Sequence, residues 1–159
     1  MKQVKMIATG MIALMVVMLI SGCGLSNLPV GEYKFSGVVY VGGISSATAD
    51  ELVRRKATTE YRIGETFLRI ADGSGSQSFS NITYKKEKLT DSAIKKSYNI
   101  EDTKLMAFFN QFKQRYRYRM LDSSGAPISY YIFQMDDQLF ISQYAKSDSL
   151  IFSIDQLKG

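Results

Sequence analysis

The sequence contains no histidine and no tryptophan, and it has only one cysteine and two prolines. Without histidine, the commonest general base and the commonest transition-metal ligand are both missing. This excludes Ser-His-Asp and Cys-His catalysis, His-ligated metals and most zinc hydrolases. A single cysteine forms no internal disulfide and no cysteine-based zinc site. We therefore expect a non-catalytic protein with no metal and no other cofactor.

A large excess of one charge is also absent. The chain has 20 basic and 15 acidic residues, and two of the basic ones, Lys2 and Lys5, stand at its start. The rest of the chain has 18 basic and 15 acidic residues, a net charge of +3. This balance argues against a nucleic-acid partner. It is compatible with a position near an anionic membrane surface.

The residues that are present indicate one β-rich globular domain. The length of 159 residues suits a single domain, and a hydrophobic fraction of 45% is ordinary for a globular protein. Ten tyrosines and nine phenylalanines favour packed strands.

The N-terminus has the pattern of an export signal. Lys2 and Lys5 precede an uncharged apolar run, Met6–Ile20. As a helix at about 1.5 Å per residue this run covers roughly 22 Å, whereas a bilayer core needs about 30 Å. It is therefore short for a permanent span and suits a signal peptide.

The end of that run, Ile20-Ser21-Gly22-Cys23, resembles the lipobox of bacterial lipoproteins. The resemblance covers about the first 23 residues. It implies that a diacylglyceryl group is attached to the Cys23 thiol and that the leader is cut between Gly22 and Cys23. An ordinary signal peptide, or an uncleaved anchor with an incidental cysteine, is the alternative. Two acyl chains hold a protein on a membrane stably, whereas one holds it marginally.

The resemblance also predicts the domain organisation and the location. Residues 1–22 are a removed leader, residues 23–31 are a lipidated N-terminus with a short tether, and residues 32–159 form one globular domain. The protein is expected on the extracytoplasmic face of the cell membrane. Because Gly24 rather than aspartate follows the cysteine, the class pattern places it in the outer membrane if the organism has two membranes. The sequence does not tell which envelope applies.

Alternating apolar residues and turn residues predict six to eight antiparallel strands. We expect strands at residues 32–41, 58–63, 66–70, 78–84, 115–121, 128–135, 138–144 and 150–154. In the first, Tyr33, Phe35, Val39 and Val41 share a face and Gly37 allows a bend or bulge. The opening Gly31-x-Tyr33-x-Phe35 is similar to the first strand of small lipocalin-like barrels.

One to three short helices are expected beside the strands. Residues 45–56 begin at a serine cap, Ser45 or Ser46, and end in basic residues. Residues 90–96 form either a short helix or an ordered loop. Residues 102–112 carry apolar residues at helical spacing, with a strand as the alternative. The fold class is therefore α+β or mainly β, an antiparallel meander. A lipocalin-like partly closed barrel is the first choice, and a curved sheet with helices on one face is the second.

One strand carries the main candidate ligand face. Arg115, Arg117 and Arg119 alternate with Tyr116 and Tyr118. Three guanidinium groups on one face can bind phosphate or an acidic polymer. The alternative is that the arginines form a solvated face while the tyrosines point into the core.

Weaker motifs have simpler explanations. Arg54-Arg55-Lys56 is either a contact to lipid phosphate or a solvated helix end. The turn at Gly73–Gly75 lacks the ending of a phosphate loop. Asp136-Asp137 supplies too few oxygens for Ca²⁺. Ser92 and Lys95 have Ser-x-x-Lys spacing, but the companion motifs of that enzyme class are absent.

The expected function is a membrane-anchored surface lipoprotein that acts as a binding or accessory module. Its partner is a protein or a small apolar or envelope ligand. The alternative is an envelope structural or regulatory protein of the inhibitor or immunity type, and a third class is a small envelope enzyme. An apolar cavity of a few hundred Å³ would indicate a lipid carrier. A filled barrel would indicate binding through the surface.

Overall fold

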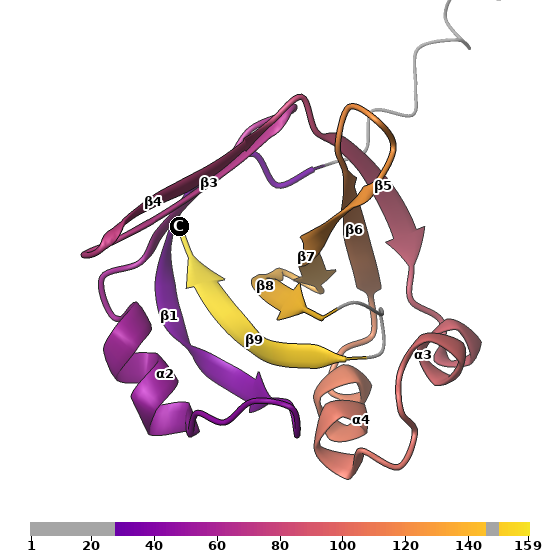
Figure 1. Cartoon of the computed structure of the whole chain (residues 1–159). Helices are drawn as coiled ribbons and strands as arrows, with labels where there is room; N and C mark the ends of the chain where they lie inside the picture. Colours follow the sequence, from indigo (N-terminus) through magenta and orange to yellow (C-terminus); the bar gives the residue numbers. More distant parts are fainter. Residues whose placement is uncertain (1–27, 146–149) are drawn as a thin grey trace, which may run out of the picture.

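The computed structural model describes residues 28–145 and 150–159, so the predicted leader and Cys23 lie outside the described residues. In these two ranges nine strands form one curled antiparallel sheet, with helices outside the curve (Figure 1). The order across the sheet is β4-β3-β2-β1-β9-β8-β7-β6-β5. The strands are β1 (Gly31–Val41), β2 (Glu60–Ile63), β3 (Phe67–Asp72), β4 (Gly75–Ser80), β5 (Thr83–Lys88), β6 (Arg115–Leu121), β7 (Pro127–Met135), β8 (Gln138–Tyr144) and β9 (Ile151–Lys158).

This arrangement confirms the predicted mainly β antiparallel meander. All neighbours in the sheet are neighbours in the chain except β1 and β9, whose pairing joins the two halves. The result is a half-barrel, consistent with a lipocalin-like partly closed barrel. The described residues form nine strands, above the six to eight expected, because the chain between residues 78 and 88 forms two strands.

The break between those two strands sets the shape of the sheet. The single strand expected at residues 78–84 is wrong, because Asn81 has a φ of 56°, in the left-handed region that ends a strand. The Ile82 N–H then donates to the Thr66 carbonyl at 2.8 Å. β4 and β5 follow each other in the chain but form opposite edges of the sheet. The curl brings these edges together at this corner, and from there they diverge.

Strand β1 changes faces along its length. Tyr33 lies opposite Tyr61 and Phe35 opposite Leu157, all on the inner face of the curl. Irregularities between Phe35 and Gly37, and again between Val38 and Tyr40, interrupt the alternation. A bulge near Gly37 was expected. The second irregularity was not, so Tyr40 rather than its neighbour Val39 is buried.

Two hydrophobic cores lie on the two faces of the sheet. The inner core joins opposite walls of the curl and includes Leu68, Tyr118, Met120, Ile132 and Ile141, all at most 2% exposed. The outer core lies between the other face and the helices α3 (Asp91–Ser97) and α4 (Thr103–Asn110). Helices are confirmed for both segments where a loop or a strand was the alternative.

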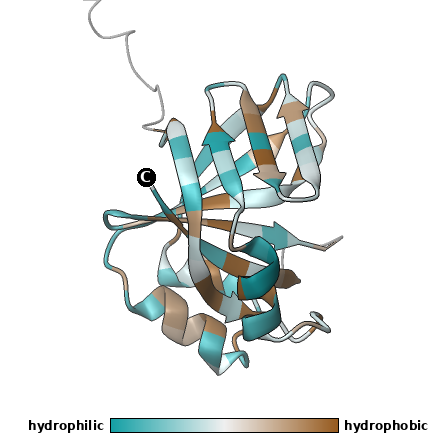
Figure 2. Ribbon diagram, turned by 90° about the vertical axis from the view of Figure 1, so that its left-hand side faces the viewer, coloured by the Kyte–Doolittle hydropathy of each residue, from teal (hydrophilic) through white to brown (hydrophobic). Residues whose placement is uncertain are grey.

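Helix α4 covers the outer face because its apolar residues share one side. Leu105, Phe108 and Phe109 are buried, and Asp102 caps the helix by accepting from the Leu105 N–H. Phe108 packs edge-on against Phe140 with ring centroids 5.2 Å apart. Figure 2 shows that α4 is more hydrophobic than α2 (Ala49–Lys56), the helix nearest the viewer: α4 is largely brown, whereas α2 is mostly teal.

Helix α2 has no buried residue and begins later than expected. Its cap is Thr48, not Ser45 or Ser46. Thr48 and Glu51 form a capping box, in which each side chain accepts from the backbone N–H of the other residue. The acidic first turn and basic last turn match the helix dipole, as the sequence predicts.

Candidate binding site

The arginines of β6 face the outer core rather than solvent. They lie opposite Met135, Phe133 and Tyr131 of β7, and the first two contact residues at the two ends of α3. Arg117 is 3% exposed and donates to Glu87 Oε2 from Nη2 at 2.6 Å and from Nε at 3.0 Å. Its Nη1 donates to the Tyr98 hydroxyl at 2.9 Å. Arg117 is therefore held by the protein itself.

The other two arginines are also engaged. Arg115 pairs with Asp91, at the start of α3, and Arg119 Nε lies 3.5 Å from Glu87 Oε1. The expected alternative of a solvated arginine face is wrong for Arg117. The same alternative also predicted that the tyrosines point into the core, and this is correct for Tyr118, which is fully buried in the inner core. Burial lowers the pKa of Arg117, but its interactions with Tyr98 and Glu87 outweigh this effect, so the group remains charged.

Buried side chains pack inside the curl, and a cavity of about 320 Å³, lined by both polar and apolar residues, lies at its mouth. Asp155 lies in its wall and is 4% exposed. Lys56, from the end of α2, donates to Asp155 Oδ2 at 2.6 Å and to Ser153 Oγ at 3.0 Å. The Tyr61 hydroxyl donates to the same carboxylate oxygen at 3.5 Å. These groups form a largely buried polar cluster beside the inner core.

Burial dominates the electrostatics of this cluster. It raises the pKa of Asp155, although Lys56, Ser153 and Tyr61 all act to lower it. It also raises the pKa of Tyr61, and the neighbouring Asp155 charge adds to that effect. Perturbed titrating groups that converge on a cavity are typical of functional sites, but ion-pair networks also produce them.

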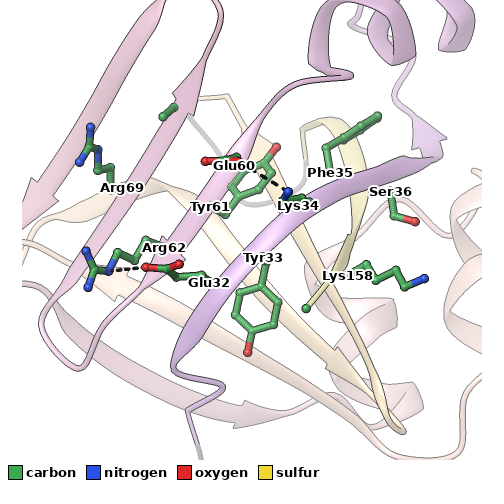
Figure 3. Close-up of a pocket in the computed structure, with 12 residues that line it drawn as sticks. Glu32, Tyr33, Lys34, Phe35, Ser36, Glu60, Tyr61, Arg62, Arg69 and Lys158 are labelled. Carbon is green, nitrogen blue, oxygen red and sulfur yellow. Dashed lines mark ion pairs between the residues drawn. The ribbon is translucent and has the colours of Figure 1, made fainter.

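A larger hollow of about 700 Å³ lies where β1, β2, β3 and the end of β9 meet (Figure 3). Two exposed ion pairs join lining residues of β1 and β2, Arg62 Nε to Glu32 at 3.3 Å and Lys34 Nζ to Glu60 at 3.9 Å. Surface pairs of this kind contribute only about 0–1 kcal/mol to stability. A charged ligand can therefore replace either partner of these ion pairs at little cost in stability.

The hollow has further groups suited to a polar partner. Arg69 from β3 and Lys158 from β9 lie on opposite sides of it (Figure 3). Tyr33 and Phe35 from β1 supply half-buried aromatic surface. The lining thus combines charged side chains with aromatic ones, and both kinds of residue are found at interaction surfaces.

The sequence did not single out these residues. The sequence predicts a lipid contact or a solvated helix end for Lys56, whereas the structure directs it into the barrel mouth. Asp155 lies beyond the expected end of the last strand. One signal in the sequence indicates such a cluster: Asp155 is an acidic residue at an inward position of the strand, between Ser153 and Leu157.

The remaining motifs have local structural roles. Asp72 accepts from the Ser74 and Gly75 N–H groups and closes the turn between β3 and β4. Asp136 accepts from the Gln114 N–H at 2.7 Å and fastens the β7–β8 turn to the start of β6. Across residues 28–145 and 150–159, no group of three or more potential metal-ligating side chains comes together. None of the helices in these ranges is long and apolar enough to cross a membrane.

Comparison with known proteins gives no match to a family model, a curated protein or a solved structure.

Proposed function

We propose that the chain is a lipid-anchored bacterial surface lipoprotein that acts as a non-catalytic binding module at the extracytoplasmic face of the cell membrane. The lipobox-like Ile20-Ser21-Gly22-Cys23 supports the anchor. The charged hollow of about 700 Å³ is the observation that carries the binding role.

The position of the hollow relative to Cys23 fits this proposal. Glu32 in its wall is the ninth residue after Cys23. At no more than about 3.5 Å per residue, the chain between them spans at most about 32 Å. A partner bound in the hollow would therefore lie close to the bilayer.

The filled inner core favours a protein partner over an apolar small ligand. A carrier of lipids needs an apolar cavity, whereas the mouth cavity has the Lys56–Asp155 ion pair among its apolar lining residues. The hollow presents both signs of charge and aromatic side chains, which suit a protein surface of mixed charge.

The test is recovery of partners from membranes with the intact lipidated protein. We would compare wild type with Lys34→Glu/Arg62→Glu, which reverses two charges of the hollow. The control is Lys95→Glu/Lys104→Glu, which makes the same change in charge at exposed positions of α3 and α4. The proposal expects a partner that is retained by wild type and the control and lost by the hollow variant. Equal recovery by all three proteins, or no specific partner for wild type, would contradict it.

A further inference from the structure

The two edges of the sheet differ in how they are protected. Edge strand β5 has the sequence Thr-Tyr-Lys-Lys-Glu-Lys, whereas β4 has Gly-Ser-Gln-Ser-Phe-Ser, with no charge and no proline. Exposed edges of soluble proteins are usually blocked by charged residues, proline or bulges, because their free backbone groups pair with other strands. By this criterion β5 is blocked and β4 is open.

The lysines of β5 include charges directed to the inner face. Lys86 lies opposite Tyr118, and its ammonium group is 4.3 Å from the centroid of the Tyr116 ring. A charge on the inner face of an edge strand discourages another strand from docking there. No residue of β4 has a comparable charge.

The backbone register shows which β4 groups face the open edge. The Gly64 N–H donates to the Phe67 carbonyl at 2.9 Å, so this opposite pair is hydrogen-bonded. Hydrogen-bonded and non-hydrogen-bonded pairs alternate in antiparallel ladders. Residues 68, 70 and 72 of β3 therefore direct their backbone groups to β4, where their partners are residues 79, 77 and 75. This leaves the N–H and C=O groups of Ser76, Ser78 and Ser80 directed away from the sheet.

Half-buried apolar side chains gather beside this edge. Phe79 of β4 packs edge-on against Tyr130 of β7, with centroids 5.7 Å apart, across the open side of the curl. Ile70, Ile128 and Tyr84 are also only partly buried members of the inner core. An added strand would cover this surface with every second side chain and present the others to solvent.

We propose that the β4 edge binds an extended segment of a partner protein, in which apolar and polar residues alternate, by β-strand addition. The segment would extend the sheet beyond β4 and narrow the gap to β5. Main-chain hydrogen bonds to Ser76, Ser78 and Ser80 would provide affinity, and the surface around Phe79 and Tyr130 would select the apolar side chains. This interaction is independent of the hollow and of the lipid anchor.

The probe is a fluorescent octapeptide that alternates valine with threonine or glutamate, added to the intact lipidated protein in detergent micelles. Anisotropy gives the affinity, and hydrogen–deuterium exchange locates the site. The key variant is Ser78→Pro, since proline removes an outward N–H and leaves the β3–β4 ladder intact. Ser78→Thr is the control, because it keeps the N–H and favours a strand. The matched control for the peptide carries N-methyl groups on alternate amides, which removes the N–H groups that would donate to β4.

We expect saturable binding to wild type and Ser78→Thr, with slower exchange confined to residues 75–80. Ser78→Pro and the N-methylated peptide should bind at least ten-fold more weakly. Unfolding midpoints show whether Ser78→Pro is folded, and Ser76→Pro is the second variant if it is not. The proposal is overturned if wild type does not bind, if Ser78→Pro binds equally well, or if protection appears elsewhere. It is also overturned if β4 is already protected by self-association of the protein.

Discussion

The arginine strand gives the sharpest stability prediction, because a structural arginine and a ligand-binding arginine respond differently to truncation. Arg117→Ala removes two hydrogen bonds to Glu87 and one to Tyr98 from a site that is 3% exposed. Removing one partner of a buried ion pair typically costs about 3–5 kcal/mol. Arg119→Ala removes a side chain that is 31% exposed and whose Nε lies 3.5 Å from Glu87 Oε1, so we expect a cost below about 1 kcal/mol.

Urea denaturation followed by circular dichroism measures both values. With a slope of about 2 kcal/mol/M, the Arg117→Ala midpoint should fall by roughly 1.5–2.5 M and that of Arg119→Ala by less than about 0.5 M. A double-mutant cycle with Glu87→Gln should give a coupling of at least about 1 kcal/mol. If Arg117→Ala cost no more than Arg119→Ala, the contacts of the guanidinium to Tyr98 and Glu87 would not stabilise the fold, and its role as a ligand group would return.

Three further predictions concern other parts of the fold. Asp155→Asn tests the effect of burial on the Asp155 carboxyl group. Burial raises its pKa above 3.8, so the folded state binds this proton more tightly than the unfolded state does. The contribution of Asp155 to stability is therefore greatest below pH 3.8 and falls as the pH rises through the raised pKa. The stability of wild type minus that of Asp155→Asn, from urea melts at several pH values, should therefore decrease with rising pH, and an increase would show that the attraction to Lys56 outweighs burial. Gly42→Ala places a Cβ 1.8 Å from the Ile151 carbonyl oxygen and should cost about 1–3 kcal/mol, whereas Gly37→Ala meets nothing within 4 Å; equal melting temperatures would contradict this close approach. Thr48→Ala removes the cap of α2 and should cost about 1 kcal/mol in a urea melt, whereas Ser46→Ala should cost almost nothing, and the reverse order would restore the serine cap.

Elements with local signals could be predicted from the sequence. The hairpin around Gly64 and the one at Asp136 follow from turn residues between alternating strands, and both are present. Helix α4 follows from apolar residues at 105, 108, 109 and 112 with Asp102 as its cap. In each case the interactions that determine the structure lie within a few residues of one another.

Features that depend on distant contacts could not be predicted. The pairing of β1 with β9 joins the two ends of the domain, and the second irregularity in β1 reverses the faces of Val39 and Tyr40. The burial of Arg117 depends on Tyr98, at the end of α3, and on Glu87 of the neighbouring strand β5. The sequence shows that arginines alternate with tyrosines, but the partners that neutralise Arg117, Glu87 and Tyr98, come from separate elements.

The same reason explains the candidate sites. The hollow combines charges from four strands, and the mouth cavity joins Lys56 of α2 to Asp155 of β9. No short motif contains either group. The lipobox-like segment is the opposite case, because its proposed chemistry needs only neighbouring residues.

The central claim is the lipid anchor on Cys23. The intact mass of the mature protein, purified from bacterial membranes, tests it most directly. The proposal predicts a mature chain that begins at Cys23 and carries a diacylglyceryl group. It also predicts that Cys23→Ala abolishes labelling by a fatty-acid probe and accumulates as the unprocessed precursor. A mature N-terminus at another residue, or unchanged labelling of Cys23→Ala, would contradict the account.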